Sequence, residues 1–76
     1  MKSYDDNVAV LTVNGVDRPF PQGLPASVAD LLNQLGMDAA TVVAEVDGRI
    51  VERKDFSSQG LRSGQAIELV RFVGGG

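Results

Sequence analysis

Two turn dipeptides, Asn14-Gly15 and Asp47-Gly48, constrain the fold of this chain more than any other feature. Each lies between two short apolar segments, and each suits the positive φ angles of a two-residue β-hairpin turn. The pattern predicts one hairpin with strands at 8–13 and 16–20, and a second with strands at 42–46 and 49–52. Pro19 has no backbone N–H, so the strand at 16–20 is expected at an edge of the sheet.

A single helix is predicted between the two hairpins. Apolar residues recur at i, i+3, i+4 and i+7 from Val28 to Leu35, which places them on one helical face. Ser27 suits the N-cap, and the carboxylate of Asp30 suits the electropositive first turn. Gly36 is placed to stop the helix as the residue after its C-cap.

A final strand is predicted at 66–73, after a polar connector at 53–60 with room for a short helical turn and a tight turn at 61–65. No repeat or linker divides the chain, so we expect one α+β domain with a mixed four- to five-stranded sheet packed on one main helix. The first and last strands are the most apolar and are expected side by side at the sheet centre. This arrangement is the β-grasp, or ubiquitin-like, fold. We expect it at residues 8–73, after a polar lead at 1–7 and before a flexible tail at 74–76.

Composition narrows the function. With 76 residues, the chain favours a binding or carrier module over an enzyme with a deep pocket. It has no cysteine and no histidine, which removes disulfides, thiol nucleophiles and the usual transition-metal ligands. A net charge of −3 disfavours binding to nucleic acid. No apolar run approaches the length of a membrane span, and residues 1–7 do not read as a signal sequence, so we expect a cytoplasmic protein that binds no membrane.

The most informative residues are Gly74, Gly75 and Gly76, which directly follow the last apolar strand. Glycines without side chains can enter a channel too narrow for any other residue. From Val73 onward, four residues span at most about 13–14 Å when extended. This reach would carry the α-carboxylate of Gly76 into the active site of another protein. The alternatives are a frayed end, a cloning scar or chance.

Several stretches together resemble one family. They are Val13-Asn14-Gly15, the predicted helix at 27–35, the second hairpin at 43–53, and residues 61–70 followed by Val73-Gly74-Gly75-Gly76. In this order they resemble the ThiS family, the sulfur carriers of thiamine biosynthesis, from about Val8 to Gly76. The sequence departs from the family pattern at Gln65, where aspartate is frequent, and in having three terminal glycines where two suffice.

The resemblance implies that Gly76 is the site of adenylation and of thiocarboxylate formation. The implied partners are a ThiF-type adenylyltransferase that uses ATP and Mg²⁺, a cysteine desulfurase or another sulfur donor, and a ThiG-type thiazole synthase. The carrier itself would hold no permanent cofactor and no metal, and would act as a cosubstrate rather than an enzyme. Two alternatives stay open: a carrier for molybdopterin or another acceptor, like the molybdopterin-synthase small subunit MoaD, and a noncovalent β-grasp interaction module.

A partner-facing surface is predicted from strand alternation. If Ile67 and Leu69 face the core, Val70 and Phe72 emerge on the open side of the sheet. The predicted surface consists of Val10, Val70, Arg71, Phe72 and Val73, with Arg71 placed to pair with an acidic partner. The alternative is that Phe72 covers the thin core.

Overall fold

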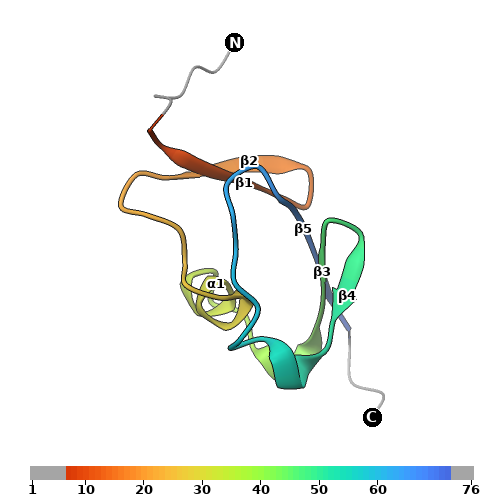
Figure 1. Ribbon diagram of the computed structural model, residues 1–76. Helices are drawn as coiled ribbons and strands as arrows, with labels where there is room; N and C mark the ends of the chain where they lie inside the picture. Colours follow the sequence, from red (N-terminus) through yellow and green to blue (C-terminus); the bar gives the residue numbers. More distant parts are fainter. Residues whose placement is uncertain (1–6, 73–76) are drawn as a thin grey trace.

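The computed structural model describes residues 7–72. The predicted glycine tail at 74–76, Val73 and nearly all of the predicted polar lead therefore lie outside the described residues. Within 7–72 the chain forms five strands, one α-helix and two 3₁₀ turns (Figure 1). In chain order these are β1 (Ala9–Val13), β2 (Val16–Phe20), α1 (Val28–Gln34), η1 (Ala39–Thr41), β3 (Val42–Val46), β4 (Arg49–Val51), η2 (Arg53–Asp55) and β5 (Ala66–Arg71).

The strands form one mixed sheet in the order β2-β1-β5-β3-β4. The first and last strands lie side by side, as predicted, and they run parallel, whereas the other three pairings are antiparallel. β2 is an edge strand, as Pro19 predicts. This α+β arrangement of a mixed sheet on one helix confirms the β-grasp prediction (Figure 1).

Both predicted hairpin turns have the backbone that their sequences favour. Asn14 and Gly15 have φ values of 50° and 80°, and Asp47 and Gly48 have values of 51° and 82°. Two successive positive φ angles match the twist of the flanking strands. The two turns therefore set the registers of β1 with β2 and of β3 with β4.

The ends of α1 follow the predicted capping scheme. The Oγ of Ser27 accepts a hydrogen bond from the backbone N–H of Asp30 at 3.2 Å. At the other end, the N–H of Gly36 donates to Asn33 at 3.1 Å and that of Met37 donates to Leu32 at 2.9 Å. With a φ of 70° at Gly36, these bonds form a Schellman motif. Local sequence thus fixes the length of the helix.

The core lies between α1 and one face of the sheet. Its most deeply buried side chains come from the helix and from the two central strands, and they are Leu11, Val28, Leu31, Leu32 and Ile67. The connector after β4 also contributes, because Phe56 is only 3% exposed. Carbonyls of Phe56 and Gln59 accept from the N–H groups of Ala29 and Val28 at the start of α1. These bonds satisfy donors that a helix N-terminus otherwise leaves unpaired.

The structure differs from the sequence prediction in small ways. The turn η1 was not expected, and β1 starts one residue later than the predicted strand at 8–13. β5 ends at Arg71, although the N–H of Phe72 still donates to the carbonyl of Thr41 at 2.9 Å. The predicted short helical turn in the connector is confirmed as η2.

Candidate functional site

The face of the sheet opposite α1, which we call the open face, carries a cluster of exposed apolar side chains. Val43 of β3 and Val70 of β5 are direct partners in the antiparallel register. They are 39% and 57% exposed. Phe72, the residue after β5, is 46% exposed, and alternation along the strand places it on the same side as Val70. The alternating burial along β5 confirms that Ile67 and Leu69 point to the core while Val70 does not. An exposed apolar cluster of this kind is a candidate contact surface on a small protein.

The structure does not bring all of the predicted surface residues together. Arg71 pairs in register with buried Val42, so its side chain leaves the sheet on the side of α1, away from Val70. Val10 is half-buried at the start of β1, where its carbonyl accepts from the N–H of Gly64 at 2.7 Å. Val10 thus lies beside Gly64, and Val70 is six residues after Gly64, a separation of roughly 20 Å at the rise of a strand. Val10 therefore lies outside the apolar cluster.

Two open-face residues, Val43 and Ile50, were not predicted from sequence. Ile50 is 69% exposed on the edge strand β4 and pairs in register with Glu45. The alternation in Val42–Val46 carries a signal for Val43, since buried residues flank it on both sides. The alternation used for β5, applied to this strand, predicts that Val43 faces away from the core.

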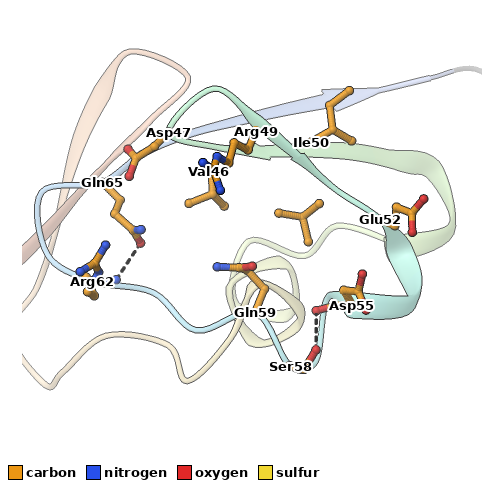
Figure 2. A pocket seen from close by; sticks show the side chains of 11 residues that line it. Val46, Asp47, Arg49, Ile50, Glu52, Asp55, Ser58, Gln59, Arg62 and Gln65 are labelled. Atoms are coloured by element: carbon orange, nitrogen blue, oxygen red, sulfur yellow. Dashed lines mark hydrogen bonds between the residues drawn. The ribbon is translucent and has the colours of Figure 1, made fainter.

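A groove of about 910 Å³ lies on the other side of the second hairpin, between β4 and the connector (Figure 2). Arg62 and Gln65 lie at one end of it, and Glu52 and Asp55 lie at the other. The backbone N–H of Arg62 donates to Oε1 of Gln65 at 2.7 Å, which closes the turn before β5. The lining residues are Val46, Asp47, Arg49, Ile50, Val51, Glu52, Asp55, Ser58, Gln59, Arg62 and Gln65.

The groove lacks the arrangement of a catalytic site. Ser58 is its only hydroxyl, and that hydroxyl donates to the carbonyl of Asp55 at 3.2 Å. No imidazole exists in the chain to act as its base. Carboxylates outnumber arginines in the lining, which disfavours an anionic ligand. Within residues 7–72, no group of three or more acidic side chains is placed to hold a metal ion.

One exposed ion pair network lies beside this groove. Nζ of Lys54 is 3.2 Å from Oδ2 of Asp55 and 3.4 Å from Oε2 of Glu52. The hydrogen bond to Asp55 and the charge of its carboxylate, followed by the same effects of Glu52, raise the pKa of Lys54 above 10.5. The network is solvated and shapes the connector rather than a binding site.

No helix within the part of the chain that the structure describes has the length and apolar character needed to cross a membrane. The helix α1 has only seven residues.

Comparison with known proteins places these features in a family. The model of the ThiS family matches residues 11–76. The crystal structure of a thiamine biosynthesis protein (ThiS) from Geobacter metallireducens has a TM-score of 0.76 and 34% identity, covering 88% of this chain and 99% of that one. The solution structure of a thiamine biosynthesis protein from the same organism has a TM-score of 0.73 and 34% identity, covering 88% and 87%.

A longer protein is also similar to most of this chain. A thiazole synthase of Paramagnetospirillum magneticum is 33% identical over 66 residues, which make up 87% of this chain and 20% of that protein. The chain thus spans about a fifth of the length of this relative. The family model, the fold and the sequences of the structural relatives agree. This chain therefore belongs to the ThiS family of sulfur carriers.

Proposed function

We propose that this chain is a sulfur carrier of thiamine biosynthesis and that the carboxylate of Gly76 carries the sulfur. The observation that carries the proposal is the family match over residues 11–76, which includes Gly74, Gly75 and Gly76. The similarity to structures of thiamine biosynthesis proteins favours this pathway over molybdopterin synthesis.

In the proposed cycle, a ThiF-type adenylyltransferase binds ATP and Mg²⁺, and a carboxylate oxygen of Gly76 attacks the α-phosphorus. Pyrophosphate leaves and an acyl adenylate forms. Hydrosulfide, drawn in the cell from a cysteine desulfurase or another donor, then attacks the acyl carbon. AMP leaves with the former carboxylate oxygen, one proton is released, and a thiocarboxylate remains on Gly76. The chain supplies the reacting carboxylate and acts as a cosubstrate in the cytoplasm, where ATP and these enzymes are found.

The folded domain has a role in this cycle because binding an extended tail is costly. Ordering each backbone residue costs about 1–2 kcal/mol, so contacts on the domain must offset the ordering of Val73 to Gly76. The apolar cluster of Val43, Val70 and Phe72 on the open face is exposed and lies where β5 leads toward that tail. We propose it as the central contact, with Arg71 and Val10 at most peripheral.

We propose a ThiG-type thiazole synthase as the sulfur acceptor. A segment similar to this chain forms part of a thiazole synthase in Paramagnetospirillum magneticum. Two activities joined in one protein commonly act on each other when they occur as separate chains, which supports a contact between this carrier and such a synthase.

The test is an intact-mass measurement after incubation with a ThiF-type adenylyltransferase, Mg²⁺, ATP and sulfide. The expected product is heavier by the replacement of one oxygen by sulfur, and tandem mass spectrometry localises the change to Gly76. The matched control is the chain lacking Gly76, whose fold is checked by circular dichroism. Thiocarboxylation of that control would contradict the proposal.

The full chain and the chain lacking Gly76 also distinguish a sulfur carrier from a noncovalent interaction module. An interaction module would bind its partner equally well with or without Gly76, and its mass would not change. A carrier loses activation when Gly76 is removed, even though the domain at 8–73 is intact.

A further inference from the structure

One turn residue, Asn14, is chemically reactive and is also held in place by the fold. The chain has three asparagines, Asn7, Asn14 and Asn33, and only Asn14 precedes a glycine. The backbone nitrogen of a following residue can attack an asparagine side chain, and glycine has no side chain to hinder that approach. The dipeptide Asn14-Gly15 is therefore the place where this chain is most open to spontaneous deamidation.

The reaction needs no reagent except water. The backbone nitrogen of Gly15 forms a bond to Cγ of Asn14, the bond from Cγ to Nδ2 breaks, and the proton of the backbone N–H leaves with Nδ2 as ammonia. Water then opens the resulting succinimide ring at one of its two carbonyls. The product at position 14 is aspartate, or isoaspartate, in which the main chain runs through the side-chain carbonyl.

Hydrogen bonds to β5 hold the reacting amide of Asn14 in the folded domain. Its Oδ1 accepts from the N–H of Leu69 at 2.7 Å, and its Nδ2 donates to the carbonyl of Leu69 at 3.1 Å. We call these two bonds the Leu69 bracket. Crowding gives no protection, because a Cβ built at Gly15 would meet nothing within 4 Å. To bring Cγ onto the nitrogen of Gly15, the side chain must leave the position in which it holds Leu69.

Asn14 lies at the shortest pairing of the sheet within residues 7–72. β1 and β5 pair at only two register positions, Thr12 with Ala66 and Val13 with Ile67, whereas β1 with β2 and β3 with β5 each pair at five. We call the junction of β1 with β5 the central seam. The amide of Asn14 lengthens this seam, since it bonds to β5 beyond the last paired residue.

The products of deamidation cannot replace the amide. A carboxylate still accepts from the N–H of Leu69, but it places a second acceptor opposite the carbonyl to which Nδ2 donated. A polar group left without its partner costs stability. Isoaspartate adds an atom to the main chain of a two-residue turn whose φ values are 50° and 80°. Both products therefore weaken the central seam.

We propose that Asn14 is a site of spontaneous deamidation, that the Leu69 bracket suppresses the reaction in the folded domain, and that the product weakens the central seam. The modification thus marks a chain that has opened at this seam and makes the next opening easier. Asp47-Gly48 is a slower site, because an ionised carboxylate resists the same attack. The inference is independent of the proposed function, since its test needs no partner enzyme.

The test follows deamidation of single residues by tandem mass spectrometry of peptides. The full chain is incubated at mildly alkaline pH, once folded and once in guanidinium chloride, and Asn33, which precedes Gln34, is the internal control. In the unfolded chain we expect Asn14 to convert roughly tenfold faster than Asn33, and Gly15→Ala to remove that difference. Folding should slow the conversion of Asn14 at least about tenfold, as expected from two hydrogen bonds.

Two results of this experiment would overturn the inference. Conversion of Asn14 no faster than that of Asn33 in the unfolded chain would remove the site. Equal conversion of Asn14 in the folded and the unfolded chain would remove the protection.

Hydrogen exchange links the protection to the Leu69 bracket. The amide hydrogen of Leu69 exchanges with solvent when its bond to Asn14 opens, so its exchange rate, measured by nuclear magnetic resonance, reports that opening. Urea concentrations below the unfolding transition should raise this exchange rate and the rate of deamidation by the same factor. Faster exchange at Leu69 with unchanged deamidation would overturn the role of the bracket.

A pair of variants tests the effect of the product. Asn14→Asp supplies the aspartate form directly, and Gln22→Glu makes the same change from amide to carboxylate at an exposed loop residue before α1. We expect Asn14→Asp to lower the ratio of folded to unfolded chain about tenfold in urea denaturation, and Gln22→Glu to leave it nearly unchanged. Equal urea midpoints for the two variants would overturn the claim that the product weakens the central seam.

Discussion

The side-chain amide of Asn14 brackets the backbone of Leu69. Its Oδ1 accepts from the N–H of Leu69 at 2.7 Å, and its Nδ2 donates to the carbonyl of Leu69 at 3.1 Å. The backbone of β1 has already turned away at this point, so the amide takes the place of a further strand residue beside β5. Asp47 acts similarly at the other hairpin, where its Oδ1 accepts from the N–H of Ala66 at 2.9 Å. Each turn residue thus ties its hairpin to the central strand.

Replacing Asn14 should therefore destabilise the domain through two separable effects. Asn14→Gly removes the bonds to Leu69 but tolerates the positive φ, and we expect a loss of about 1–2 kcal/mol in the free energy of unfolding. Asn14→Ala adds the strain of a left-handed conformation, for a total loss of about 2–4 kcal/mol. Urea denaturation followed by circular dichroism measures both. Equal losses for the two variants would show that the φ angle contributes nothing.

The N-cap of α1 gives a second stability prediction. Ser27 is 5% exposed, and its hydroxyl holds the N–H of Asp30. Ser27→Ala should lower the free energy of unfolding by about 1 kcal/mol. The matched control is Ser58→Ala, which removes an exposed hydroxyl bonded to the carbonyl of Asp55 and should change stability by less than about 0.5 kcal/mol. A larger effect at Ser58 than at Ser27 would contradict the role given to the cap.

Much of the fold could be predicted because its signals are local. Asn14-Gly15 and Asp47-Gly48 specify turn geometry by themselves, and Ser27 and Gly36 specify the ends of a helix within a few residues. Pro19 excluded a central position for its strand. The adjacency of the first and last strands also followed from sequence, because both are apolar enough to be buried on the core side.

The candidate site was harder to predict because it depends on register between distant strands. The opposition of Val43 and Val70 requires the exact alignment of β3 with β5, which a connector between them sets only after packing. The same alignment separates Val10 from Val70, although both are apolar and on one face. The bracket formed by Asn14 also depends on Leu69, fifty-five residues away. Alternation within one strand predicts which face of the sheet a side chain occupies, but not which residue of the adjacent strand lies opposite it.

The network of Lys54 predicts a pH dependence at the connector. The pKa of Lys54 is raised in the folded chain by Asp55 and Glu52. A group whose pKa is raised on folding contributes stability at pH values below its unfolded pKa, here 10.5, and loses it as the pH rises through the folded value. Nuclear magnetic resonance titration should show the Lys54 side chain deprotonating at a pH above 10.5. Asp55→Asn should lower the pKa of Lys54, and an unchanged titration would contradict the assignment.

The apolar cluster of the open face predicts a loss of activation without a loss of fold. Phe72 is 46% exposed, and its backbone N–H bonds to Thr41, a contact that does not need the aromatic ring. Phe72→Ala should therefore leave the urea midpoint nearly unchanged while lowering kcat/KM for adenylation about tenfold, as expected for a central aromatic contact. Val16→Ala is the matched control. Val16 is 53% exposed at the start of the edge strand β2, and it pairs with buried Val13, so its side chain lies on the opposite face of the sheet from the cluster. Equal losses for the two variants would mean that surface apolarity in general, rather than this cluster, favours binding. A fall in stability for Phe72→Ala with no change in kcat/KM would instead assign Phe72 to covering the core.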